Sequence, residues 1–201
     1  FDVLAYTGTG SATTIAHQLG VVPEMIWVKS RNQATDWAVY HKDLSAGQYV
    51  MLNKTNAVDT NSAYFTTTAP TSSVFSIGVG EYTNQSSSYT YVAYLFATVA
   101  GVSKVGSFSH TNGGGDTNVD CGFTSGSSLV ICKRTNDSGA WYIFDSARGI
   151  VAGNDPHLEL NSVGSGTTGF DVIDPLDSGF TITSGFLSSG TYIFYAIAAI
   201  S

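Results

Sequence analysis

Short apolar blocks recur in the same order in the two halves of this chain. Residues 25–29 match 129–133 at an offset of 104, and the other blocks keep offsets between 101 and 108. The matched blocks are 25–29 with 129–133, 36–41 with 140–145, 52–53 with 160–161, 75–77 with 180–182, and 91–97 with 192–198. Repeats of this kind restrict the fold strongly, because each copy must form the same unit. The sequence therefore predicts two tandem, diverged repeats, 1–100 and 101–201.

The matched blocks have the character of β-strands. They are short, rich in β-branched and aromatic residues, and bounded by clusters of Gly, Ser, Thr and Asn. No segment has the capped 3.6-residue period of an amphipathic helix, although Ser11 to Leu19 allows one helical turn. About six strands per copy, with frequent turns, are typical of a sandwich. We expect an all-β fold of two β-sandwich, jelly-roll-like units packed closely together.

The charge of the chain excludes several classes of partner. Charged residues make up only 11% of the sequence, and the net charge is −7. The eight basic residues are scattered and form no stripe of the kind that binds nucleic acid. No apolar run is long enough to span a membrane as a helix, so no membrane insertion is expected. Cys121 and Cys132 favour two buried free thiols over a cross-strand disulfide.

Motifs in both halves resemble a known family of phage proteins. The first half carries Tyr6-Thr7-Gly8-Thr9-Gly10, then residues 17–29, then Trp37-Ala38-Val39-Tyr40-His41. The second carries Ile131-Cys132-Lys133-Arg134-Thr135, Asp145-Ser146-Ala147-Arg148 and the closing run 191–198. Together these are similar to a tail-fibre-type or virion structural module of marine, cyanophage-like bacteriophages. The resemblance covers nearly the whole chain, although Cys132 stands where an apolar residue is expected.

The resemblance implies a location on the virion surface, outside the cell. It implies a tail-fibre or receptor-binding module that adheres to a host cell-surface glycan or protein, contacts other virion subunits, and forms a homo-oligomer, a trimer. It carries no catalytic residues and no cofactor. Two alternatives remain open: a purely structural head-decoration or spacer protein, and a carbohydrate-active enzyme that depolymerises a glycan.

Candidate binding residues lie in loops that differ between the two halves. Loops rich in Gly, Ser, Asn and Tyr supply adaptable hydrogen bonds and rigid aromatic area. We predict contact through the loops 7–13, 83–89, 111–116 and 164–169. The candidate residues are Tyr82, Asn84, Tyr89, His110, Asn112 and Asp116.

The chemistry-bearing residues do not predict an enzyme. A glycosidase needs two facing carboxylates, and nothing in the sequence pairs any two of the candidates Glu24, Asp36, Asp145, Glu159 and Asp171. Gly164-Ser165-Gly166 lacks the spacing of a nucleophile elbow. None of the four histidines has the spacing of a zinc ligand.

One metal motif is partly present. Asp116, Asn118 and Asp120 have the D-x-N-x-D spacing of a calcium loop, but Cys121 replaces the expected glycine and the closing glutamate is missing. We therefore expect a polar segment, with calcium as a weak candidate.

Structural roles are expected for three further sets: an Asp145–Arg148 ion pair after the Trp141 strand, core packing of Trp37 and Trp141, and turn hydrogen bonds from Asn53 and Asn161.

Overall fold

The computed structural model describes residues 1–200 and contains strands but no helix in that range. The chain divides into two compact units, Phe1–Ala97 and a second that begins at Thr98. The all-β prediction is confirmed. No segment among the described residues forms a helix that could cross a membrane.

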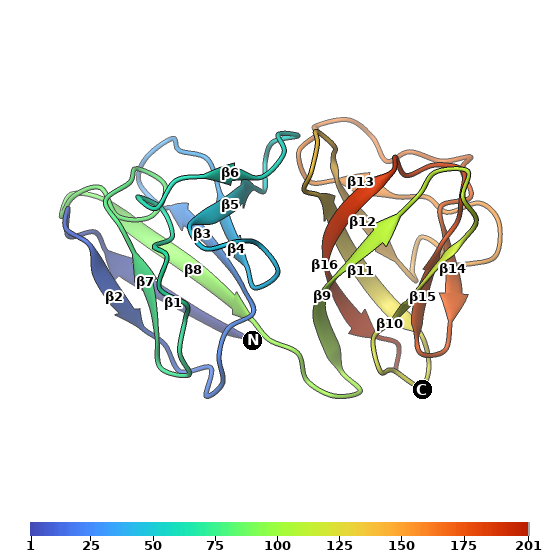
Figure 1. The fold of residues 1–201 in the computed structure, drawn as a ribbon, viewed down its shortest axis with the longest axis horizontal. Coiled ribbons are helices and arrows are strands. Elements are labelled where there is room, and N and C mark those ends of the chain that lie inside the picture. The colour runs from blue at the N-terminus through green and yellow to red at the C-terminus, as the bar shows by residue number, and fades with distance from the viewer. Residues whose placement is uncertain (201) are drawn as a thin grey trace. The chain divides into compact units, whose positions relative to one another are not determined.

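The first unit contains eight strands (Figure 1). They are β1 (Asp2–Thr7), β2 (Thr13–Ala16), β3 (Met25–Ser30), β4 (Ala38–His41), β5 (Gln48–Met51), β6 (Asp59–Thr60), β7 (Val74–Ile77) and β8 (Thr90–Phe96). Six of them form one antiparallel sheet in the order β1-β8-β3-β4-β5-β6, and β2 pairs with β7. Buried side chains of β3 and β8, such as Ile26, Val28 and Leu95, join Phe75 and Ile77 of β7 in one core, as in a sandwich.

The second unit also contains eight strands. They are β9 (Ser103–His110), β10 (Thr117–Asp120), β11 (Ser127–Arg134), β12 (Trp141–Asp145), β13 (Leu158–Glu159), β14 (Ile173–Leu176), β15 (Gly179–Ile182) and β16 (Gly190–Ala198). One sheet has the order β13-β12-β11-β16-β9, and the other has the order β10-β15-β14. Val130, Phe144 and Phe194 of the first sheet pack with Phe180 and Ile182 of the second.

The two units share a strand order. In each, the first strand pairs with the last, the last with the third, the third with the fourth, and the second with the seventh. The sixth strands differ, because β6 pairs with β5 whereas β14 pairs with β15. Common descent of the units by duplication stays a prediction, and the shared order is what a duplication would leave.

Asn53 and Asn161 make the same hydrogen bond in the two units. The Asn53 side-chain oxygen accepts from the backbone N–H of Trp37 at 3.0 Å, and that of Asn161 accepts from Trp141 at 2.6 Å. The predicted role of both asparagines in satisfying backbone groups is confirmed. Trp141 is buried as predicted, whereas Trp37 is half-buried and packs on Tyr94.

Two local expectations have clear outcomes. Ser11 to Leu19 contains no helical turn, because Thr13–Ala16 forms β2 and its β-branched residues pair with Val74–Ile77. Cys121 and Cys132 are free thiols in the core of the second unit, as predicted. Burial raises the pKa of each thiol to about 12, so neither is a thiolate at neutral pH.

Candidate functional site

Asn84 is a scaffold residue rather than part of an exposed contact. Its side chain is fully buried, and its oxygen accepts from the backbone N–H of Thr9 at 2.6 Å. Its amide nitrogen donates to the carbonyl oxygens of Ser11 and Gly78 at 2.7 and 3.0 Å. These bonds join the loop after β1 to the loop after β7 and occupy both ends of the amide. Asn84 therefore has no free group for a ligand.

The two predicted tyrosines of the first unit have different surroundings. Tyr89 is half-buried and stacks on the buried Tyr91, with ring centroids 6.3 Å apart. Tyr82 is also half-buried, but it stacks on Tyr64, with centroids 4.5 Å apart and planes 28° from parallel. Of these two tyrosines, only Tyr82 thus stacks on a second partly exposed ring.

The structure brings together the three predicted residues of the second unit, but it ties each of them to the fold. His110 is 3% exposed, and its Nδ1 lies 2.9 Å from the Thr117 hydroxyl. The Asn112 amide donates to the carbonyl oxygen of Leu187 at 2.9 Å, and an Asp116 carboxylate oxygen accepts from the backbone N–H of Ser184 at 3.0 Å. These bonds fix the loop after β9 against the segment after β15.

Burial lowers the pKa of His110, and the nearby Asp116 carboxylate only partly opposes the effect. In the unfolded chain the imidazole titrates near its ordinary value of 6.5. The unfolded state therefore binds a proton first as the pH falls, and stability present above pH 6.5 is lost below it.

We expect the urea concentration at the unfolding midpoint of the wild-type chain to decrease when the pH is lowered from about 7.5 to about 5.5. The His110→Gln variant should show a smaller fall, because it has no imidazole to protonate at this position. An equal fall in both chains, measured by urea titration at the two pH values, would show that His110 does not contribute.

Two of the three calcium candidates lie on a strand and not in a loop. Asn118 and Asp120 belong to β10, and Asp116 directly precedes it. Alternate residues of an extended strand follow one another about 6.6 Å apart along a line, whereas a calcium loop curves so that its ligands surround one ion. Each of the three side chains also accepts a hydrogen bond, from Ser184, Thr181 and Gly122 respectively. Among residues 1–200 no group of three or more His, Cys, Asp or Glu could hold a metal.

Three of the candidate carboxylates lie in ion pairs. Glu24 pairs with Lys42 at 2.9 Å, and Asp36 pairs with Lys54 at 3.5 Å. Asp145 pairs with Arg148 at 2.5 Å, so this predicted ion pair is confirmed. The other Asp145 oxygen accepts from the backbone N–H groups of residues 147 and 148. The pair therefore fixes the turn after β12.

A group of tyrosines and carboxylates in the first unit forms a candidate ligand surface, which we call the tyrosine surface. It consists of Tyr49, Tyr64, Tyr82, Asp59 and Glu81. Tyr64 contacts Tyr82 by stacking and Tyr49 edge-on, with the Tyr49 and Tyr64 centroids 4.9 Å apart. Tyr49 is buried and donates from its hydroxyl to Asp59 at 3.1 Å. A buried ring thus holds a pair of rings that reach the solvent.

A hollow of about 300 Å³ opens beside Tyr64. Its lining combines one aromatic ring with amide and carboxylate groups, from Asn61, Ala63, Tyr64, Val79, Gly80, Glu81 and Gln85. A methyl group at Gly80 would lie 2.5 Å from the Tyr64 ring, so only glycine leaves room for that ring. Hollows that offer an aromatic face and a few convergent polar groups are typical of small-ligand sites.

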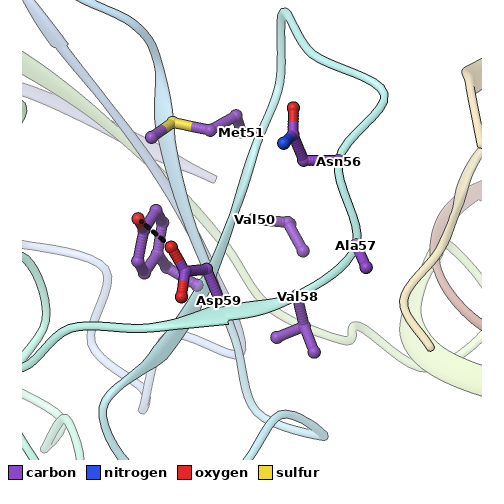
Figure 2. Close-up of a pocket in the computed structure, with 7 residues that line it drawn as sticks. Val50, Met51, Asn56, Ala57, Val58 and Asp59 are labelled. Atoms are coloured by element: carbon purple, nitrogen blue, oxygen red, sulfur yellow. Dashed lines mark hydrogen bonds between the residues drawn. The ribbon is translucent and has the colours of Figure 1, made fainter. Parts of the chain in front are cut away.

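A second hollow, of about 260 Å³, is lined in part by the hydrogen-bonded pair Tyr49 and Asp59 (Figure 2). Figure 2 shows its lining, which comes from β5 and from the segment that leads into β6. Val50 and Val58 supply apolar surface, and Asn56 and Asp59 supply polar groups. Tyr49 and Asp59 both line this hollow, and the Tyr49 ring contacts Tyr64, which lines the first one.

The tyrosine hydroxyls of this surface stay protonated at neutral pH. Burial is the main cause that raises the pKa of Tyr82, followed by the neighbouring Tyr64 and a hydrogen bond to Glu81. Burial also raises the pKa of Tyr64, and the Glu81, Asp59 and Asp36 carboxylates add to the effect while a hydrogen bond with Tyr82 opposes it. The surface thus presents hydroxyl donors among negatively charged acceptors.

The sequence prediction named Tyr82 but neither Tyr64 nor Tyr49. Tyr64 stands in a polar run, 59–73, in which no block matches the second half. The clearest sequence signal for it is Gly78-Val79-Gly80, because two close glycines indicate that something large approaches the backbone. Tyr49 occupies a strand position and is expected to be core.

Comparison with known proteins gives one match. The model of a family described as a domain of unknown function (DUF7483) matches residues 1–200. No curated protein and no solved structure matches the chain.

Proposed function

This chain belongs to the family described as a domain of unknown function, DUF7483, and we propose that it is a virion surface module that adheres to a host cell-surface glycan. The observation that carries the proposal is the stacked, partly exposed Tyr64–Tyr82 pair beside a hollow lined by Asn61, Glu81 and Gln85. The virion role rests on the sequence resemblance.

The physical basis is the chemistry of a sugar ring. A sugar has an apolar C–H face, which packs on an aromatic ring, and a rim of hydroxyl groups, which need hydrogen-bond partners. The tyrosine pair offers an aromatic surface for the C–H face, and the carboxylate and amide groups of the hollow offer hydrogen-bond partners for the hydroxyl groups. Rigid tyrosines also lose little conformational entropy on binding, which favours their use in recognition surfaces.

Replacing Tyr82 by alanine is expected to weaken binding to the preferred glycan by about tenfold or more, because it removes half of the stacked pair. Tyr89→Ala is the matched control, since Tyr89 is also a half-buried tyrosine of this unit but stacks on the buried Tyr91 and not on Tyr64. The measurement is a glycan array with the wild-type chain, followed by affinity titration of both variants on the best ligand.

The same array separates the alternatives. A structural spacer or head-decoration protein predicts no glycan signal at all. A depolymerase predicts shortened glycans after incubation, which mass spectrometry of the array ligand would detect. If Tyr89→Ala reduces the glycan signal and Tyr82→Ala does not, the binding site lies outside the tyrosine surface.

A further inference from the structure

The hollow beside Tyr64 has a one-sided charge. Glu81 is its only charged lining residue, and no lysine, arginine or histidine lines it. Asp59 and Asp36 lie close enough to act electrostatically on Tyr64. Asp36 is itself paired with Lys54 at 3.5 Å, so the negative charge beside the hollow comes mainly from Glu81 and Asp59. A ligand in this hollow therefore meets a negative potential with no positive group in the lining to offset it.

This charge pattern discriminates between kinds of sugar. An acidic sugar would place its carboxylate beside Glu81, at a cost in repulsion and in lost hydration. A sugar with a protonated amine gains an ion pair with Glu81 and a favourable contact with a tyrosine face, since ring faces attract cations. Glu81 acts electrostatically on both Tyr64 and Tyr82, so its carboxylate lies close to the ring pair.

We propose that the hollow formed by Tyr64, Glu81, Asn61 and Gln85 binds a hexose that carries a free, positively charged amino group. Glu81 is the counter-charge for the amine, and the Tyr64–Tyr82 pair supports the ring. This inference rests on the proposed glycan-binding function and adds the chemical class of the ligand.

The test compares two oligomers that differ only at the amine. Glucosamine tetrasaccharide has free amines, and its N-acetylated counterpart has neutral amides on the same rings. Calorimetric titration at about pH 6, below the ordinary range of an amine pKa, should show the free-amine oligomer binding about tenfold more tightly. Raising the salt from about 0.05 to about 0.5 M should reduce that preference, because exposed charges are screened.

Glu81→Gln keeps the shape of the side chain and removes its charge. We expect this variant to bind the two oligomers with affinities within about twofold of each other, because only the affinity for the free-amine oligomer decreases. Asp2→Asn is the matched control, because Asp2 lies on β1, at the opposite edge of the six-stranded sheet from β6. It should retain the tenfold preference.

The outcomes separate this inference from the function on which it rests. Equal binding of both oligomers by the wild-type chain overturns the inference and leaves the glycan-binding proposal standing. Binding of neither oligomer, together with a Tyr82-dependent signal for another glycan, overturns it as well. If no glycan on the array binds, both proposals fail together.

Discussion

Gly179→Ala is expected to lower the free energy of unfolding of the second unit by about 3 kcal/mol or more. A methyl group on Gly179 would lie 2.1 Å from the carbonyl oxygen of Val119 and 3.0 Å from the backbone nitrogen of Cys121. Both are backbone atoms, so no side-chain rotation relieves the clash. Gly179 faces Asp120 where β15 pairs with β10, and the added methyl must push these strands apart.

The loss is large because β15 is the central strand of its sheet and carries Phe180 and Ile182 into the core. Gly185→Ala is the matched control, since a methyl group there meets nothing within 4 Å. It should change stability by about 0.5 kcal/mol or less. Urea unfolding of the three chains gives the comparison, and a Gly179→Ala midpoint equal to that of the wild type contradicts the expected clash.

Asp155→Ala is expected to lower the free energy of unfolding of the second unit by about 3–5 kcal/mol. Asp155 is fully buried, and its carboxylate accepts three backbone hydrogen bonds. One oxygen accepts from Val172 at 2.9 Å and Ile173 at 3.0 Å, and the other accepts from Val151 at 3.2 Å. Alanine leaves these donors without their acceptor, and each buried, unsatisfied N–H costs about 1–3 kcal/mol.

Asp155 also holds the loop before β13 against the start of β14, so the Asp155→Ala substitution should increase local opening of this region. Hydrogen exchange should show faster exchange at the amides of Val172 and Ile173 in Asp155→Ala than in the wild type. Asp177→Ala, at an exposed turn between β14 and β15, is the control. In this variant the amides of Val172 and Ile173 should exchange at the wild-type rate. Unchanged protection in Asp155→Ala would show that other groups satisfy these donors.

The strands were predictable because period and composition determine them locally. The β3 and β11 blocks are apolar and β-branched, and both form central strands of their sheets. The β2 segment was ambiguous, since Thr13-Thr14-Ile15 is short and its partner β7 lies about sixty residues away. Such a pairing depends on tertiary contacts that a local pattern does not contain.

The candidate site was less predictable than the fold. Loop composition correctly separated variable segments from strands, but it does not tell whether a polar side chain faces solvent or backbone. Asn84 and Asn112 illustrate this, because both have the polarity of contact residues and both bind neighbouring carbonyl oxygens. Tyr64 was missed because its partners Tyr49 and Tyr82 come from different segments and meet only in the folded unit.

A structure of the chain bound to its best glycan tests the central claim most directly. The account predicts a sugar ring against the Tyr64–Tyr82 pair, with its polar groups bonded to Asn61, Glu81 or Gln85. A sugar bound instead at the loop 111–116 of the second unit, with the tyrosine surface empty, would contradict it.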